Sequence, residues 1–413
     1  MIAFVFPGQG SQKSGMGASW ISHPAFDLVR EASEVLKRDF EYLLIKAPIE
    51  ELTSTENAQM ATFLQSLIVL DAAERMGFAP IAVAGHSLGE YTALVASGVI
   101  SFEDGLKLVD IRGNSMKQAT DTVKGSMAAV LGTDLTTAEI ACSLAGLDCV
   151  VANDNSSSQI VISGPEDELD EAIQHLKRLG AKKAIKLQVG GAFHSRLMLP
   201  AKIPLIESLG SVEFRDAEIP VITNVDARPH TSGHDFFMLE SAQITSKVRW
   251  RQTMETLSDM NITSIVELGP GSVLSGLAKR EPCLKAVSSI SIESPDDLNK
   301  LLHLTSSSIE VFEDSHKNEV LGEALHTKMR VILSPASGLF RGSDYFEFDN
   351  KNPNMPFEKI LKNVVKIQVG DQIGSIDDTP VLSPFKGTLK GLLAIPLHKV
   401  ERGEPLFWML SSD

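Results

Sequence analysis

A serine between two glycines is the part of this sequence that most clearly could do chemistry. In the stretch IAVAGHSLGEYTALVASG (81–98), Ser87 follows a short apolar run and precedes residues with helical spacing. The pattern Gly-x-Ser-x-Gly between a strand and a helix is typical of a sharp elbow that exposes a nucleophilic hydroxyl. Glycines beside a serine also form ordinary tight turns, so that alternative stays open. The flanking strand and helix patterns favour the nucleophile.

A serine nucleophile needs a base to take its proton, and two of the ten histidines are candidates. His86 is the immediate neighbour of Ser87, but adjacent side chains on an elbow diverge, which favours a structural role. His194, in GGAFHSRLM, follows a segment with the pattern of an inserted unit, so the chain could re-enter a cleft there. Taken alone, such a histidine is more often an ordinary core or surface residue.

The reaction also needs an oxyanion hole, a set of donors that stabilises the negative oxygen formed during attack. The turn PGQGSQ (7–12) follows the first predicted strand, and α/β sheets place their sites at such carboxyl ends. The amide of Gln9 is one candidate donor. Ser11 and Gln12 are alternatives on sequence alone.

One cation lies among apolar neighbours in a helical pattern. Arg112, in LVDIRGNSM, could pair with an acid such as Asp110 or with carbonyl groups at a helix end. It could instead face a cleft and bind a substrate carboxylate through two parallel hydrogen bonds. On the residues alone, the first interpretation is the simpler one.

Composition narrows the class of protein. With 413 residues, the chain is too long for one compact core, so two or more domains are expected. Its net charge of −15 argues against nucleic-acid binding as its main role. The spacing of the three cysteines fits neither a disulfide framework nor a metal site, and we expect Cys142 and Cys149 to be buried thiols. No signal-peptide pattern and no apolar run of the roughly 20 residues needed to span a membrane is present, which favours a cytoplasmic protein.

The elements that must position these residues alternate between strands and helices. Strand patterns at 2–6 and 81–86 are interleaved with helical patterns at 24–40 and 101–119, which favours an α/β layer with a parallel sheet. From about 125 to 190 the order becomes β-α-β-β-α-β, typical of a ferredoxin-like unit inserted in the larger domain. The main layer then resumes.

A region of different character follows. Residues 304–328, rich in serine and charge, are interpreted as a linker. Within 329–413, ILSPASGLFRG (332–342) is similar to VLSPFKGTLKG (381–391), which indicates an internal repeat. Two β-rich halves with glycine turns predict a small pseudo-symmetric barrel or sandwich. The stretch 344–358 is interpreted as a loop inserted in the first half.

Eight motifs together amount to a resemblance. In chain order they are FPGQGSQ, GHSLGEYTALVASGVI, IRGNSM, VANDNSSSQIVISG, AFHSRLM, PVITNVDARP, QITSKVRW and ELGPGSVLSGLAKR. Residues 1 to about 303 thereby resemble the malonyl-CoA:acyl carrier protein transacylases. The resemblance implies an α/β-hydrolase-like parallel-sheet core with an inserted ferredoxin-like subdomain. It also makes the cleft-facing interpretation of Arg112 the favoured one.

Carried over residue by residue, the resemblance implies Ser87 as the nucleophile and His194 as its base. Gln9 and the backbone N–H of Leu88 would form the oxyanion hole, and Arg112 would hold the malonyl carboxylate.

Three further positions follow from the resemblance. In this family main-chain carbonyls rather than a carboxylate orient the histidine, and the matching position is Arg249 in SKVRW. Lys247 stands in the same segment where many relatives carry proline. Phe193, directly before His194, resembles the residue at this place in malonyl-selective relatives. Its ring would crowd an α-methyl branch on the substrate, so methylmalonyl should be disfavoured.

The implied reaction moves the malonyl group from malonyl-CoA to the phosphopantetheine thiol of acyl carrier protein through a malonyl-serine ester, for fatty-acid or polyketide synthesis. It implies no metal and no cofactor of the chain's own. The basic run 176–186 is either a docking site for an acidic carrier protein or a solvated face. A serine thioesterase or other hydrolase is the rival enzyme, although no convincing acid for a Ser-His-Asp triad is found. A scaffold that acts through its C-terminal module is the rival of another class.

The C-terminal region, 329–413, resembles the biotinyl/lipoyl-attachment type of domain, an all-β barrel-sandwich. In those carriers the modified lysine lies on the hairpin that joins the two halves. Here that hairpin, GSIDDTPVLSP, has Asp377 and Asp378 and no lysine, while Lys366 and Lys386 belong to other turns. We therefore expect an unmodified module used for interaction or assembly.

Overall fold

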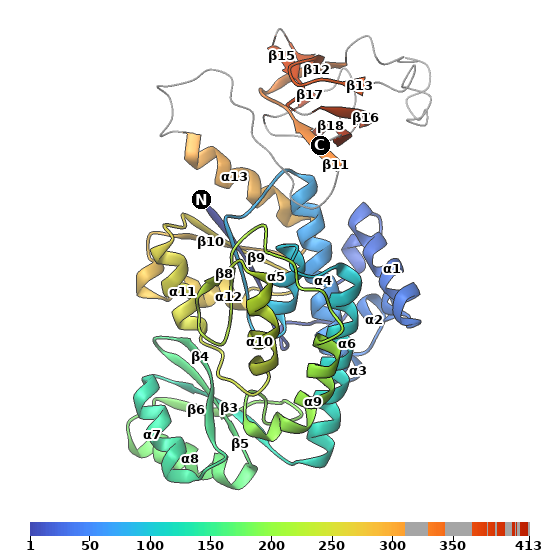
Figure 1. The fold of residues 1–413 in the computed structure, drawn as a ribbon. Helices are drawn as coiled ribbons and strands as arrows, with labels where there is room; N and C mark the ends of the chain where they lie inside the picture. Colours follow the sequence, from blue (N-terminus) through green and yellow to red (C-terminus); the bar gives the residue numbers. More distant parts are fainter. Residues whose placement is uncertain are drawn as a thin grey trace. The chain divides into compact units, whose positions relative to one another are not determined.

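The chain forms two compact units in a computed structural model (Figure 1). Unit 1 comprises residues 1–70 and 80–298, and unit 2 comprises 71–79 and 299–413. The structure describes residues 1–309, 329–342, 366–377, 379–384, 386–392, 399–400, 402 and 405–411. Most of the expected linker and the whole expected loop insertion, 344–358, lie outside the described residues.

A six-stranded sheet forms the centre of unit 1, with strand order β10-β9-β1-β2-β7-β8. The first five strands in that order are parallel, and β8 joins β7 antiparallel. The prediction of an α/β fold with a parallel sheet is thus confirmed. The strands are β1 (Ile2–Phe6), β2 (Ala82–Gly85), β7 (Val221–Ile222), β8 (Pro229–His230), β9 (Ser264–Leu268) and β10 (Ser288–Ile292).

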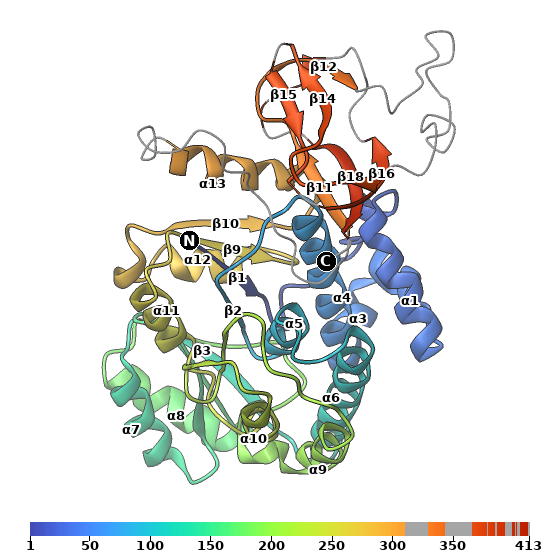
Figure 2. The same cartoon turned by 45° about the horizontal axis from the view of Figure 1, so that its top comes forward.

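Helices surround this sheet (Figures 1 and 2). The expected helix at 24–40 is interrupted, because Lys37 adopts a left-handed φ of 54° that ends α1, and Asp39 then caps α2 through the backbone N–H of Tyr42. The α-helices of this part of the chain are α1 (Asp27–Leu36), α2 (Phe40–Ile45), α3 (Ile49–Leu52), α4 (Thr55–Arg75), α5 (Gly89–Ala96), α6 (Phe102–Thr122), α9 (Leu199–Leu209), α10 (Gly233–Gln243), α11 (Trp250–Asp259) and α12 (Val273–Ala278). The short 3₁₀ segments are Ala18–Trp20, Pro24–Phe26, Arg196–Met198, Pro282–Leu284 and Pro295–Leu298.

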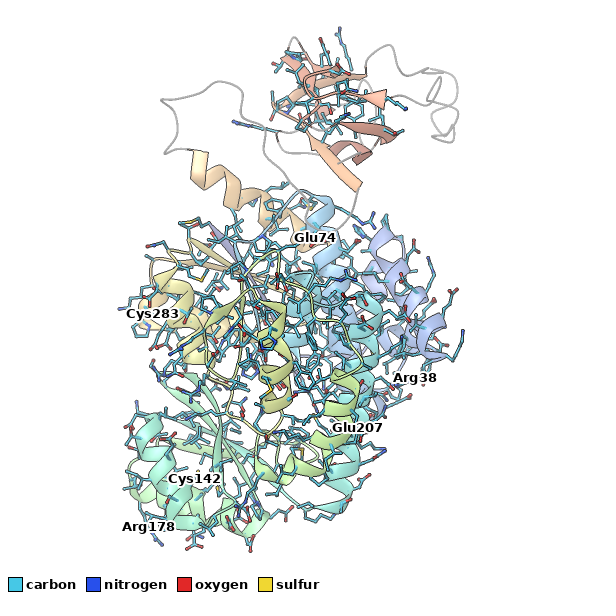
Figure 3. All side chains as sticks on the ribbon, viewed as in Figure 1. Arg38, Glu74, Cys142, Arg178, Glu207 and Cys283 are labelled. Atoms are coloured by element: carbon cyan, nitrogen blue, oxygen red, sulfur yellow. The ribbon has the colours of Figure 1, made fainter. Side chains whose placement is uncertain are left out.

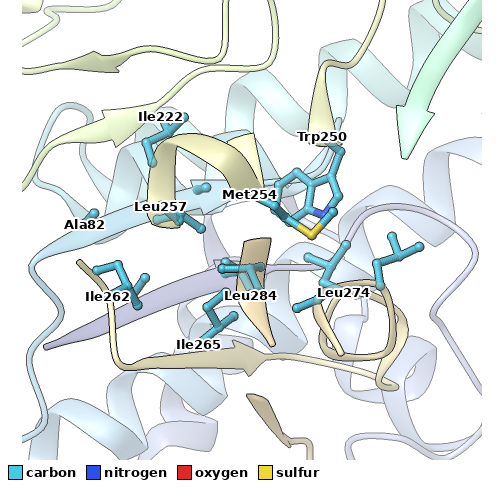
Figure 4. Packing of buried hydrophobic residues seen from close by; sticks show 14 of the residues in the cluster. Ala82, Ile222, Trp250, Met254, Leu257, Ile262, Ile265, Leu274 and Leu284 are labelled. Atoms are coloured by element: carbon cyan, nitrogen blue, oxygen red, sulfur yellow. The ribbon is translucent and has the colours of Figure 1, made fainter. Parts of the chain in front are cut away.

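One hydrophobic cluster fixes α11 on the sheet (Figure 4). Trp250, Met254 and Leu257 recur with helical spacing on α11, so all three face the same side. They pack with Ile265 of β9 and Leu274 of α12, and all five side chains are buried. Each such burial is worth roughly 1.5–3 kcal/mol. The start of α11, which borders the site described below, is therefore held firmly.

The inserted part has an antiparallel sheet of its own, with order β4-β5-β3-β6. Both of its helices cover one face and share a core with the sheet (Figure 2). Asp154 and Val248 tie this part to the segment before α11, since the N–H of Asp154 donates to the carbonyl of Val248 at 2.9 Å. The elements are β3 (Ser126–Leu131), α7 (Leu135–Ala145), β4 (Val150–Ser156), β5 (Gln159–Gly164), α8 (Glu166–Arg178) and β6 (Lys183–Lys186).

Two of the three cysteines fit the expectation for thiols of a packed core, and Cys283 is exposed. Cys142 on α7 and Cys149 before β4 are free and buried, as predicted, and both belong to the core of the inserted part (Figure 3). Among the residues that the structure describes, no helix combines the length and the apolar character that a membrane span requires.

Unit 2 contains helix α13 (Asn299–Ile309) and two four-stranded sheets, of order β11-β18-β16-β13 and β15-β14-β12-β17. The two copies of the internal repeat supply β11–β12 and β15–β16, which occupy matching places in opposite sheets. Phe340 and Phe407 meet edge to face, 5.4 Å between ring centroids, in a shared core. The strands are β11 (Met329–Leu333), β12 (Gly338–Gly342), β13 (Lys366–Ile367), β14 (Gln372–Ile376), β15 (Thr379–Leu382), β16 (Gly387–Leu392), β17 (Lys399–Val400) and β18 (Pro405–Ser411).

The crossing of β2 and α5 leaves no room for a side chain at Gly85. A Cβ there would overlap the backbone of Gly89, the first residue of α5. We predict that Gly85→Ala lowers the free energy of unfolding of unit 1 by at least ~3 kcal/mol, because neither backbone can move without breaking the elbow.

The test measures the urea concentration at the midpoint of unfolding. Unfolding is monitored by the fluorescence of Trp20 and Trp250 in a Trp408→Phe background. Gly276→Ala is the matched control, since a Cβ there meets only the end of Arg280 at 3.8 Å and a helical alanine should stabilise by about 0.5–1 kcal/mol. An unchanged midpoint for Gly85→Ala would contradict the account of this crossing.

Candidate active site

Ser87 lies on the connection between β2 and α5, as the sequence predicted. Its φ is 53°, in the left-handed region that non-glycine residues rarely adopt. Asn224 holds the backbone in this conformation: its Oδ1 accepts from the N–H of Ser87 at 2.7 Å, and its Nδ2 donates to the carbonyl of Gly85 at 2.6 Å. A strained residue persists only where its surroundings fix it, so this amide clamp stabilises the elbow.

His194 lies against the hydroxyl of Ser87. Its Nε2 is 2.6 Å from Ser87 Oγ, and its Nδ1 faces two backbone carbonyls, Ser246 O at 2.9 Å and Gln243 O at 3.2 Å. Carbonyls only accept hydrogen bonds, so Nδ1 carries the proton and Nε2 has a free lone pair. The ring is thereby oriented as a proton acceptor for Ser87. His194 also has a left-handed φ, of 57°.

The expectation for Arg249 is wrong. Its carbonyl accepts from the N–H of Thr253 at 2.9 Å as the first acceptor of α11, and its own N–H donates to the carbonyl of Asn224 at 3.1 Å. Val248, one residue earlier, is hydrogen-bonded to β4 through both its N–H and its carbonyl group. The carbonyl that reaches His194 most closely is therefore that of Ser246, before this bound segment begins.

Arg112 is buried at the same place, and its two terminal nitrogens contact neutral oxygens. Nη1 donates to Gln59 Oε1 at 2.7 Å, while Nη2 donates to Ser87 Oγ and to Gln243 Oε1, both at 3.0 Å. The Tyr91 ring lies beneath the guanidinium, with its centroid 5.5 Å from Cζ. The simpler sequence interpretation fails, because Asp110 pairs with Arg38 at 2.8 Å instead.

Gln9 and Leu88 lie on the two backbone segments that meet at the elbow. The strands β1 and β2 are paired up to Phe6 and Gly85. The backbone N–H of His86 then donates to the carbonyl of Phe6 at 3.0 Å. Gln9 follows in the turn after β1, and Leu88 directly precedes α5. Within the described part of the chain, neither the Gln9 side chain nor the Leu88 N–H makes a hydrogen bond.

The structure gives the following positions for the remaining residues that the sequence singled out. Gln12, an alternative to Gln9, has its Oε1 engaged by the N–H of Gly10 at 2.7 Å. Phe193 is buried and directly precedes His194. His86 binds Asn155 Oδ1 through Nε2 at 2.8 Å and packs on Trp250, in agreement with its expected structural role. Lys247 pairs with Glu139 of α7.

Burial governs the protonation of the site. Loss of hydration, with the positive charge of Arg112 and the ring of His86, lowers the pKa of His194 to about 3. Burial raises the pKa of Glu90 to about 7, against the hydrogen bonds that its carboxylate accepts from Gln243 Nε2 and the N–H of Asn224. The pKa of Glu240 is also raised by burial, well above that of an ordinary carboxyl group. His194 is consequently neutral near pH 7.

Sequence reasoning missed the residues that organise the site. Asn224 and Gln243 each hold two or more of its groups, and Ser246 orients His194. A signal existed for all three, since they lie in the motifs PVITNVDARP and QITSKVRW. No motif marked Gln59. Among the described residues, no group of three or more histidine, cysteine or acidic side chains is arranged to hold a metal ion.

Known proteins are similar in sequence to most of this chain. The family profile described as "Acyl transferase domain" matches residues 3–291. The malonyl CoA-acyl carrier protein transacylase of Bacillus subtilis is 40% identical over 308 residues, 72% of this chain and 95% of that protein. The protein of the same description from Escherichia coli strain K12 is 38% identical over 284 residues, 68% of this chain and 92% of that one.

Solved structures agree in fold. An acyl carrier protein S-malonyltransferase from Vibrio cholerae superposes with a TM-score of 0.70 and 37% identity, over 73% of this chain and 99% of that chain. A malonyl-transacylase solved in complex with its type II PKS acyl-carrier protein has a TM-score of 0.70 and 35% identity, over 73% of this chain and 99% of its own. The chain therefore belongs to the acyl transferase family that includes the malonyl CoA-acyl carrier protein transacylases.

Proposed function

We propose that this protein transfers the malonyl group from malonyl-CoA to the phosphopantetheine thiol of acyl carrier protein through an ester on Ser87. The observation that carries the proposal is the meeting of two groups at one hydroxyl: His194 Nε2 at 2.6 Å and Arg112 Nη2 at 3.0 Å from Ser87 Oγ. A base and a cation at the same oxygen suit attack on a thioester whose acyl chain ends in a carboxylate. The names of the relatives support this substrate and this acceptor.

In the first half-reaction, Ser87 Oγ attacks the thioester carbonyl as its proton passes to His194 Nε2. The N–H of Leu88 and the amide of Gln9 are the proposed donors to the oxyanion. Collapse of the tetrahedral intermediate expels the CoA sulfur, which takes the proton from His194. In the second half, the carrier thiol gives its proton to His194 and attacks the malonyl ester, and His194 then returns the proton to the leaving Ser87 Oγ. The reaction is ping-pong, and we propose that it needs no metal and no cofactor of the chain's own.

Arg112 is the proposed selector of the acyl group. The malonyl carboxylate can take the place of neutral acceptors at its terminal nitrogens, whereas acetyl offers nothing to bind the buried guanidinium. Phe193, directly before His194, would crowd an α-methyl branch and so disfavour methylmalonyl.

The carrier protein is the proposed partner, and fatty-acid or polyketide synthesis in the cytoplasm is the proposed setting. We propose that the basic run 176–186 steers the acidic carrier towards the site. The run covers the end of α8, with the labelled Arg178 (Figure 3), and the edge strand β6. We propose no role in binding nucleic acid or membranes.

Two finer assignments of fold complete the proposal. The sheet order β4-β5-β3-β6 with two helices on one face supports a ferredoxin-like subdomain inserted at about 125–190 in a domain spanning 1–303. The matched sheet orders of unit 2 support a biotinyl/lipoyl-like barrel-sandwich at 329–413, joined by a linker at 304–328. Its β14–β15 hairpin turns at Asp377 and carries no lysine, so we propose an unmodified module for interaction or assembly.

The test of the reaction is a transfer assay with malonyl-CoA and holo acyl carrier protein. We expect malonyl-carrier to accumulate much faster than free malonate, because the thiol attacks an ester shielded from water. Ser87→Ala should abolish both products. Free malonate as the main product would replace the transferase by a hydrolase, and no turnover would favour the scaffold.

We predict that Arg112→Met lowers kcat/KM for malonyl-CoA by roughly 100-fold, the equivalent of a charge-assisted pair worth about 3 kcal/mol. Transfer of acetyl should change far less, because acetyl makes no ion pair. Arg38→Met is the matched control. Arg38 binds Asp110, which lies on α6 as Arg112 does, and it binds no residue of the site. Equal losses for malonyl and acetyl would contradict the role of Arg112.

A second prediction concerns the protonation of His194. Its lowered pKa keeps the ring neutral, and thus able to accept a proton, well below the pH at which an ordinary histidine becomes charged near 6.5. We expect the ring carbon signal of His194 in ¹³C-edited NMR to stay in the neutral form down to about pH 4. Arg112→Met should raise the midpoint, because one positive neighbour is removed. A midpoint near 6.5 in the unmodified protein would disprove this prediction.

A further inference from the structure

Glu240 is a buried acid that the reaction does not use. It lies on α10, three residues before Gln243, so both side chains face the same side of the helix. It is completely buried, and neither carboxyl oxygen makes a hydrogen bond of good geometry among the described residues, although Glu90 and Tyr91 lie within reach. A buried carboxylate without a hydrogen bond is very unfavourable, whereas a neutral carboxylic acid is tolerated. The geometry alone therefore favours a protonated Glu240.

The neighbours of Glu240 are those of the proposed malonyl site. From α5, Glu90 and Tyr91 act on it electrostatically, and Arg112 does so from α6. On its own helix, Gln243 binds both Arg112 and Glu90. Helix α9 also packs on α10, and its Lys202 is partly exposed and its Glu207 exposed (Figure 3).

Above pH 7 the charges in this space are already balanced without Glu240, because burial holds the pKa of Glu90 at about 7. Glu90 accepts hydrogen bonds from the N–H of Asn224 at 2.9 Å and from Gln243 Nε2 at 2.7 Å, which suit a carboxylate, and its charge offsets that of Arg112. Two ionised carboxylates side by side in a buried site repel each other, so one of the pair keeps its proton. Glu240, which accepts no hydrogen bond of good geometry, is that one.

We propose that Glu240 is the residue that keeps Arg112 available: its carboxyl group stays protonated while the malonyl carboxylate is bound, and its ionisation drives that carboxylate from Arg112. This inference rests on the proposed function and adds a residue that couples acyl selection to pH. The proton exchanges with solvent, and no covalent bond other than O–H changes. Burial raises the pKa of Glu240 in the direction that the proposal needs.

The first test is spectroscopic and does not require turnover. In the infrared difference spectrum between the unmodified protein and Glu240→Gln at pH 7, we expect the carbonyl band of a protonated carboxylic acid, which should persist when malonyl-CoA is added to the Ser87→Ala form of both proteins. Glutamine has the same shape and keeps a polar group at this position. Absence of that band would overturn the proposal.

The second test measures binding of malonyl-CoA and acetyl-CoA to Ser87→Ala from pH 8 to 10, above the pKa of Glu90 of about 7. We expect the affinity for malonyl-CoA, relative to acetyl-CoA, to fall towards tenfold per pH unit on the alkaline side. Glu240→Gln should remove this fall, and Glu207→Gln, which deletes an exposed charge of the same sign, should retain it. Equal profiles for the unmodified and Glu240→Gln proteins would overturn the inference, whereas failure of malonyl-CoA to bind at every pH would overturn the proposed function itself.

Discussion

The rest of the site depends on the hydrogen bonds that the carboxamide of Gln243 makes. Its Nε2 donates to the carbonyl of Ser87 at 2.8 Å and to Glu90 at 2.7 Å, while its Oε1 accepts from Arg112 at 3.0 Å. Its backbone carbonyl faces His194. A neutral amide can donate and accept at once, so it joins an elbow, an acid and a cation without adding a charge to a buried space. Unpaired, those groups would carry a large desolvation penalty.

The same contacts maintain backbone strain where the chemistry is proposed. Ser87 and His194 both have left-handed φ values, although neither is glycine. Each is held by groups from distant parts of the chain: Asn224 binds the elbow, and the carbonyls of Gln243 and Ser246 bind the imidazole. The parallel sheet aligns the elbow with the turn after β1, and the inserted sheet fixes Val248 before α11. Strain at a functional site is stable only with such support.

Sequence patterns predict the features of the fold whose physical cause lies in residues close together in the chain. The parallel strands, the elbow at Ser87 and the buried thiols follow from apolar runs and turn residues near in sequence, and the internal repeat anticipated the matched sheets of unit 2. Lys37 broke an expected helix because one residue adopts a left-handed φ, which a helical pattern does not reveal.

The long-range features could not be predicted in this way. The environment of Arg112 depends on Gln59 and Gln243, 53 and 131 residues away in the sequence, so the residues left two interpretations open. The carbonyl that orients His194 depends on where α11 begins, which is why Arg249 was the wrong choice. An acid in a helix, such as Glu240, gives no sign in the sequence that it is buried.

The central claim is that the Ser87 hydroxyl carries the malonyl group between two thiols. Intact-protein mass spectrometry after brief incubation with malonyl-CoA, and then with holo acyl carrier protein, tests it most directly. We expect a malonyl adduct on the peptide that contains Ser87, which disappears as the same mass increase appears on the carrier. An adduct on another residue, or carrier malonylation that persists in Ser87→Ala, would contradict it.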